Sequence, residues 1–120
     1  MPHDPFAHLL EAEEVGEVTV VRFRGRHIRE EEAIRAVSRS LGRLVERDGR
    51  TRLLLDFAGI EHLASLIIAA LLQLRDRTRK AGGRLALCGL RPDVAEVFRI
   101  TGVDKVLNIY PGEQEALASF

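Results

Sequence analysis

The sequence has little cysteine, no tryptophan and no excess of either charge. Its single cysteine, Cys88, excludes an internal disulfide and fits a reducing compartment. Lys and Arg number 18, as do Asp and Glu. Because nucleic-acid binding needs a basic excess on one face, we expect no nucleic-acid partner. No leader peptide is visible, and no apolar run approaches the roughly 20 residues of a membrane span. We therefore predict a cytoplasmic protein without a membrane span.

Patterns that mark catalytic and metal sites are also missing. The histidines, His3, His8, His27 and His62, lack the spacing of metal ligands, and the last two are expected in surface loops. No glycine-rich phosphate loop follows a predicted strand. Cys88 falls in a predicted buried strand, where a cysteine usually serves as a small core residue rather than a nucleophile. We therefore predict a protein that is not an enzyme and uses no metal or cofactor.

What remains is the composition of one globular domain, with 46% hydrophobic and 30% charged residues. Residues 1–8 lack periodicity and are predicted to be a flexible N-terminus, followed by a domain over 9–120. Hydrophobic periodicity predicts the order β-β-α-β-α-β-α-β-α. Because helices join most successive strands, the sheet should be mostly parallel, with an antiparallel hairpin at its start. The predicted strands cover 9–13, 18–24, 52–57, 84–88 and 106–110, and the predicted helices cover 29–47, 65–81, a short stretch closed by Gly102, and the chain end.

The stretch from Arg52 to Leu74 is central to the expected fold. Three leucines form a buried strand that ends at Asp56, and a short connection leads to a helix headed by Ser65. The serine hydroxyl can accept a hydrogen bond from an unpaired backbone N–H, so Ser65 is predicted to be the N-cap. The expected core face of this helix consists of Ile68, Leu71, Leu72 and Leu74. Leu66 and Ile67, beside Ser65, do not belong to this core face. Either neighbouring loops cover them, or they form an apolar patch that binds a partner.

Three features of this chain are typical of a known family. The first is the hairpin-first order of elements. The second is a buried strand that ends in Asp and a small-residue loop, here LLLDFAGI at 53–60, and the third is Ser65 at the head of the next helix, followed by GGRLALCGL at 82–90 and VFRITGVD at 97–104. In these features the chain resembles the STAS domains, which include bacterial anti-sigma-factor antagonists. The resemblance runs from about Leu9 to the C-terminus and implies a single α/β domain with a mixed, mostly parallel sheet.

The resemblance also implies a regulatory site. In the family the residues at this helix commonly read Asp-Ser-Ser-Gly, and a partner kinase phosphorylates the first serine. Ala64, Ser65, Leu66 and Ile67 take those places here, so only the modified serine is kept. The implied partner is an anti-sigma factor that is also a serine protein kinase, and the sequence leaves a homodimer open. The implied contact surface consists of Gly59, Glu61, His62, Leu63, Ala64, Ser65, Leu66 and Ile67.

Phosphorylation of Ser65 could act as a switch. A phosphate at a helix start is tolerated by the fold, but it puts about −2 charge on an otherwise apolar patch that a partner must desolvate. The alternative is that Ser65 is only an N-cap worth roughly 1 kcal/mol and is never modified.

Two other functions stay open. One is a STAS scaffold or subunit of a larger assembly, such as a lipid-transport complex, that does not cycle through phosphorylation. The other, from a different class, is a receiver-like phosphoacceptor in which Asp56 takes the phosphate with magnesium and Glu13 and Glu14 supply the acidic pair. Against it, the hairpin start is wrong for a receiver, and no lysine follows the last strand at Tyr110. We instead expect Asp56 to bond loop amides and hold the turn before Ser65.

Overall fold

The computed structural model describes residues 9–120, so the prediction for residues 1–8 lies outside that range. The predicted β-β-α-β-α-β-α-β-α order is confirmed, and three short elements, β3, β5 and η2, are added to it. The elements are β1 (Leu10–Val15), β2 (Val18–Phe23), β3 (His27–Ile28), α1 (Glu31–Glu46), β4 (Arg52–Asp56), β5 (His62–Leu63), α2 (Leu66–Lys80), β6 (Arg84–Cys88), α3 (Pro92–Ile100), η2 (Val103–Lys105), β7 (Asn108–Tyr110) and α4 (Glu113–Ala118).

The main sheet has five strands in the order β1-β2-β4-β6-β7. β1 is antiparallel to β2, and every other neighbouring pair is parallel. The predicted mixed sheet with an antiparallel edge is therefore confirmed. The hairpin is tighter than predicted, because Val15 already pairs with Val18. Its turn needs a glycine, since Gly16 has a φ of +62°.

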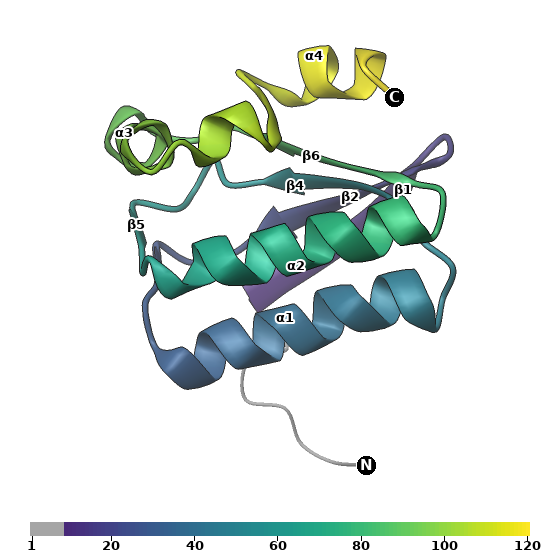
Figure 1. Ribbon diagram of the computed structural model, residues 1–120, viewed down its shortest axis with the longest axis horizontal. Helices are drawn as coiled ribbons and strands as arrows, with labels where there is room; N and C mark the ends of the chain where they lie inside the picture. Colours follow the sequence, from purple (N-terminus) through teal and green to yellow (C-terminus); the bar gives the residue numbers. More distant parts are fainter. Residues whose placement is uncertain (1–8) are drawn as a thin grey trace.

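The sheet is the middle of three layers (Figure 1). Helices α1 and α2 lie side by side on one face, and α4 covers the other by contacting β4, β6 and β7. Side chains alternate along a strand, so Leu53 and Leu55 of β4 face α1 and α2 while Leu54 faces α4. All three are fully buried, which explains the unbroken apolar run in this strand. Among the described residues, no helix is long and apolar enough to cross a membrane.

The core face of α2 differs from the predicted one. Its buried residues are Ile67, Leu71, Leu74 and Thr78, which follow one another at spacings of four, three and four and so share a helix face. Ile67 is only 1% exposed. The prediction that left Ile67 out of the core face of this helix was therefore wrong. Ile68 and Leu72 are only partly buried. The run from Leu66 to Leu72 contains no polar residue, so its sequence alone did not show which face turns inward.

Strands β3 and β5 form a second, two-stranded parallel sheet that the sequence did not predict. His27 pairs with His62 and Ile28 with Leu63, so these two histidines lie in strands and not in loops. The Ala64 N–H donates to the Ile28 carbonyl at 2.9 Å, and the Glu61 N–H donates to the Arg26 carbonyl at 2.7 Å. This small sheet ties the segment before α2 to the segment before α1 and thereby fixes the position of Ser65.

Candidate functional site

Ser65 lies between β5 and α2 with its side chain exposed. Its backbone is already helical, with φ −58° and ψ −23°, and its hydroxyl makes no capping hydrogen bond. Ser65 thus occupies the N-cap position of α2 as predicted, but the predicted capping hydrogen bond is absent, because a capping side chain usually needs an extended backbone to reach the free N–H groups. A tight first turn satisfies those groups instead: Ile67 N–H donates to the Ala64 carbonyl and Ile68 N–H to the Ser65 carbonyl. The hydroxyl is left free for other chemistry.

The neighbours of Ser65 divide into an exposed and a buried set. Leu66 is 49% exposed, whereas Ile67 lies in the core. Ile67 therefore cannot offer its side chain to a partner, and the patch predicted around Ser65 loses this residue. The other predicted contact residues are all at least partly exposed, and they are Gly59, Glu61, His62, Leu63, Ala64, Ser65 and Leu66.

Helix α3 contributes to the same site, which the sequence did not indicate. A cavity of about 210 Å³ separates the start of α2 from α3, with Ala64, Ser65 and Ile68 on one side and Asp93 and Val97 on the other. Val94 and Phe98, one turn apart, are the buried residues of α3. This helical spacing is the one sequence signal that could have indicated that Val97 faces outward. Val97 and Ile100 are 42% and 71% exposed. Val97 lines the cavity and Leu66 directly follows Ser65, so these two residues add exposed apolar area to the site.

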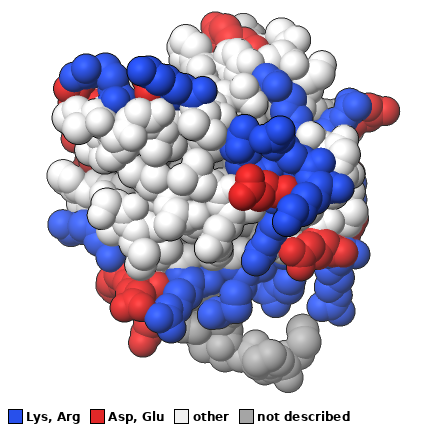
Figure 2. All heavy atoms as spheres, in the orientation of Figure 1, with Lys and Arg blue, Asp and Glu red and all other residues white. Residues whose placement is uncertain are grey.

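The charge distribution sets this surface apart from the rest of the helical layer (Figure 2). Uncharged atoms dominate the left part of the view, over the N-terminal half of α2, while Lys and Arg gather on the right, over the C-terminal halves of α1 and α2. The basic residues there include Arg43, Arg75, Arg77, Arg79 and Lys80. The surface over the N-terminal half of α2 is therefore largely uncharged, whereas the cavity beside Ser65 is also lined by the charged residues Arg29, Glu61 and Asp93.

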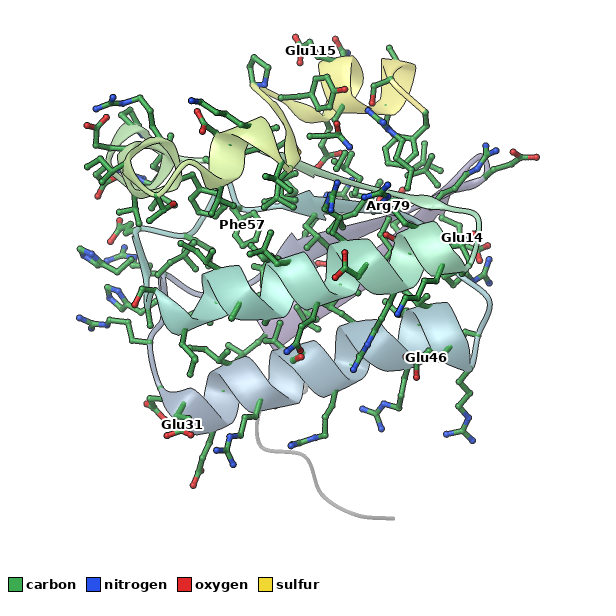
Figure 3. The ribbon with its side chains drawn as sticks, in the orientation of Figure 1. Glu14, Glu31, Glu46, Phe57, Arg79 and Glu115 are labelled. Atoms are coloured by element: carbon green, nitrogen blue, oxygen red, sulfur yellow. The ribbon has the colours of Figure 1, made fainter. Side chains whose placement is uncertain are left out.

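Asp56 lies at the end of β4 and holds the loop that leads toward Ser65. Its Oδ1 accepts a hydrogen bond from the Ala58 N–H at 2.9 Å. On the α4 side, Arg22 donates from two nitrogens to Glu113, each at 2.8 Å, and also donates to Glu13. Gly89 lies against this carboxylate, since a Cβ atom there would be 2.7 Å from Asp56 Oδ1. The Asp56 carboxylate is therefore held by the backbone of the loop that follows β4 and is closely approached by Gly89. Figure 3 shows the side chains that fill the space between the layers.

The two neighbouring carboxylates have pKa values shifted in opposite directions. Burial, followed by the nearby Glu113 carboxylate, raises the pKa of Asp56 to about 6. The hydrogen bonds from Arg22, followed by the contact with Asp56, lower the pKa of Glu113 to about 2. Burial also raises the pKa of the adjacent Cys88 thiol to about 12, which leaves this fully buried cysteine unreactive.

The receiver interpretation of Asp56 does not fit this fold. Glu13 and Glu14 lie within β1, where they pair with Arg22 and Arg50, and β1 runs antiparallel to its neighbour. Within residues 9–120, no three or more His, Cys, Asp and Glu side chains gather into a group able to hold a metal ion. His3 and His8 lie outside the described residues.

Known proteins resemble this chain in sequence. The family model of the STAS domain matches residues 10–116. BtrV of Bordetella bronchiseptica, a protein assigned to the anti-sigma factor antagonists, is 31% identical over 72 residues, which cover 60% of this chain and 62% of BtrV. The match thus spans less than two thirds of that relative.

Solved structures share the fold over nearly the whole length. An anti-sigma factor antagonist from Mycobacterium paratuberculosis superposes with a TM-score of 0.80 at 24% identity, covering 97% of this chain and 96% of that one. SpoIIAA, an anti-sigma factor antagonist in its unphosphorylated form, superposes with a TM-score of 0.76 at 19% identity, covering 90% and 92%. With the family model spanning all strands and helices from β1 into α4, this chain belongs to the STAS domain family.

Proposed function

We propose that this protein is a cytoplasmic, non-enzymatic anti-sigma-factor antagonist that binds a serine-kinase-type anti-sigma factor through the surface around Ser65. One observation carries the proposal: Ser65 is exposed, its hydroxyl has no capping bond, and it lines a cavity of about 210 Å³ next to the exposed Leu66. The similarity to BtrV and to solved anti-sigma factor antagonists supports this choice of partner.

The unmodified surface has the features of a protein contact. Leu66, next to Ser65, and Val97, which lines the cavity, expose apolar area at the site, and a partner that covers them gains the free energy of removing that area from water. Burying the exposed half of Leu66 alone is worth about 1 kcal/mol. Exposed aliphatic side chains with charged residues around them are common in transient protein–protein interfaces.

Phosphorylation of Ser65 would make binding of the partner to this surface unfavourable. The phosphate adds about −2 charge and three acceptor oxygens, and a partner covering Leu66 would have to remove water from them. The fold itself would tolerate the group, because the serine hydroxyl does not hold the first turn of α2. SpoIIAA of Bacillus, a structural relative with a TM-score of 0.69 at 19% identity, has a known phosphorylated form, which supports this kind of switch.

The experiment uses the serine-kinase-type anti-sigma factor of the source organism. With labelled ATP we expect one phosphate on the wild-type chain and none on Ser65→Ala, because Ser65 is the acceptor. By calorimetry, Ser65→Ala should bind like the wild type, while Ser65→Glu should bind at least about tenfold more weakly, a loss of about 1.4 kcal/mol. Gln73→Glu is the matched control, since it adds one negative charge at an exposed position of the same helix.

Three results would contradict the proposal. Binding without labelling would favour the STAS scaffold that is not phosphorylated. Equal binding by Ser65→Glu and the wild type would remove the switch, and absence of binding by the wild type would remove the proposed partner.

A further inference from the structure

The small sheet of β3 and β5 carries basic side chains on its outer face. His27 and His62 are opposite each other in the ladder, and their rings stack with centroids 4.9 Å apart and an interplanar angle of 16°. Ile28 is fully buried, so its side chain marks the inner face. Because side chains alternate along an extended strand, Arg29 follows His27 on the outer side.

Arg29 lies close to Ser65. The hydrogen bond from Ala64 N–H to the Ile28 carbonyl extends the ladder by one residue, which brings Arg29 opposite Ala64. Arg29, His62 and Ser65 also line the same cavity of about 210 Å³. The side chain of Ala64 carries no charge, so no carboxylate at that position competes for the guanidinium.

Arg29 also differs from the arginines of the neighbouring strands. Arg22, Arg24 and Arg52 each pair with a glutamate, whereas no ion pair within residues 9–120 includes Arg29. Its exposed guanidinium is thus available for an anion.

Two carboxylates limit where an anion can lie. Glu61 and Asp93 also line the cavity and would repel a phosphate that entered its acidic side. An anion on Ser65 is accordingly favoured on the side of Arg29 and His62.

We propose that Arg29, together with the stacked His27 and His62, forms a receiving site for a phosphomonoester dianion on Ser65. The inference rests on the proposed function, because it concerns the phosphorylated form of that site. The planar guanidinium of Arg29 can donate two parallel N–H bonds to phosphate oxygens, and an imidazole N–H of His62 can donate a third. Phosphorylation then acts twice on the partner surface, since it adds an anion and also engages the cation that the unmodified surface exposes.

The test measures the second ionisation of the phosphate itself. The full chain is produced with phosphoserine incorporated at position 65 during translation, and its phosphorus NMR signal is titrated between pH 4 and 8. Arg29 should lower the second phosphate pKa, so Arg29→Gln should raise it by about half a pH unit, the effect of one charge at about 5 Å in water. His62→Gln should shift it in the same direction by less. Arg29→Lys, which keeps the charge, should retain most of the lowering.

Arg26→Gln is the matched control. It removes the same charge from an exposed position of the same segment, but Arg26 is not among the residues that line the cavity beside Ser65. If Arg29→Gln and Arg26→Gln leave the phosphate pKa equally unchanged, the receiving site does not exist.

The measurement needs neither the kinase nor the anti-sigma factor, so its outcome separates the two proposals. If Arg29→Gln leaves the second phosphate pKa unchanged while the phosphorylated chain still releases its partner, the receiving site is refuted and the proposed function remains. A phosphate held by Arg29 in a chain that binds the partner equally in both forms would support the receiving site and overturn the switch.

Discussion

Replacing Asp56 by Asn should make the protein more stable at pH 8. The pKa of Asp56 is raised to about 6 in the folded protein by burial and by Glu113, whereas an unfolded Asp has a pKa of about 3.9. Between these values the folded state binds more protons than the unfolded state, so this residue lowers the free energy of unfolding as pH rises from about 4 to 6. Above pH 6 the whole penalty is present, and the substitution should remove it.

The structure also sets the size of the effect. A shift of about two pKa units corresponds to about 3 kcal/mol, but Asp56 is only partly buried, so screening by water reduces the expected gain to about 1 kcal/mol. Asn keeps an oxygen for the Ala58 N–H and adds an amide donor beside Glu113. Because the pKa of Glu113 is lowered to about 2, that residue instead stabilises the fold as pH rises from about 2 to 4.5. The wild type should therefore be most stable at about pH 4 to 4.5, where the two opposing contributions balance.

Urea unfolding followed by circular dichroism, at pH 5, 6.5 and 8 and constant ionic strength, measures both proteins. Wild-type stability should fall across this range, and that of Asp56→Asn should stay nearly constant. Asp104→Asn, at an exposed position of η2, is the control and should change stability by less than about 0.5 kcal/mol. Wild-type stability that does not vary with pH, or an Asp56→Asn protein that is less stable at pH 8, would refute the reasoning.

Two further pairs of substitutions test the packing around the site. Ile67→Ala should lower the free energy of unfolding by about 2 to 4 kcal/mol because it leaves a cavity in the core, whereas Leu66→Ala should change it by less than about 0.5 kcal/mol and weaken partner binding; equal melting temperatures for the two variants would contradict the assignment of Ile67 to the core. Gly89→Ala should cost more stability than Gly49→Ala in chemical denaturation. Both glycines have positive φ, +73° and +67°, but only at Gly89 would the new Cβ lie 2.7 Å from Asp56 Oδ1; equal losses would show that this contact relaxes freely.

Much of the fold could be predicted because its main elements carry their own periodic signals. The β-branched alternation of β2, the amphipathic pattern of α1 and the apolar run of β4 each depend on neighbours in sequence. The pairing of β3 with β5 could not be predicted in this way, since each strand has two residues and the hydrogen bonds join residues 26–28 to residues 61–64.

The candidate site could be predicted only in part for the same reason. Ser65 was found from its position at a helix start, but its free hydroxyl depends on a local backbone conformation that the sequence does not indicate. The contribution of Val97 depends on how α3 sits beside α2, and that of Arg29 on the small sheet. These contacts all join distant segments, and no short pattern in the chain encodes them.

The burial of β4 on both faces has a consequence for how the molecule opens. Amide hydrogens of Leu53, Leu54 and Leu55 lie at the centre of the ladder, between β2 and β6, and can reach solvent deuterium only when the whole domain unfolds. The turn at Ser65, held by a few hydrogen bonds at the periphery, can open without that event. If Ser65 is phosphorylated as proposed, the kinase would need to distort only this turn, and repeated phosphorylation would not bring the chain close to unfolding.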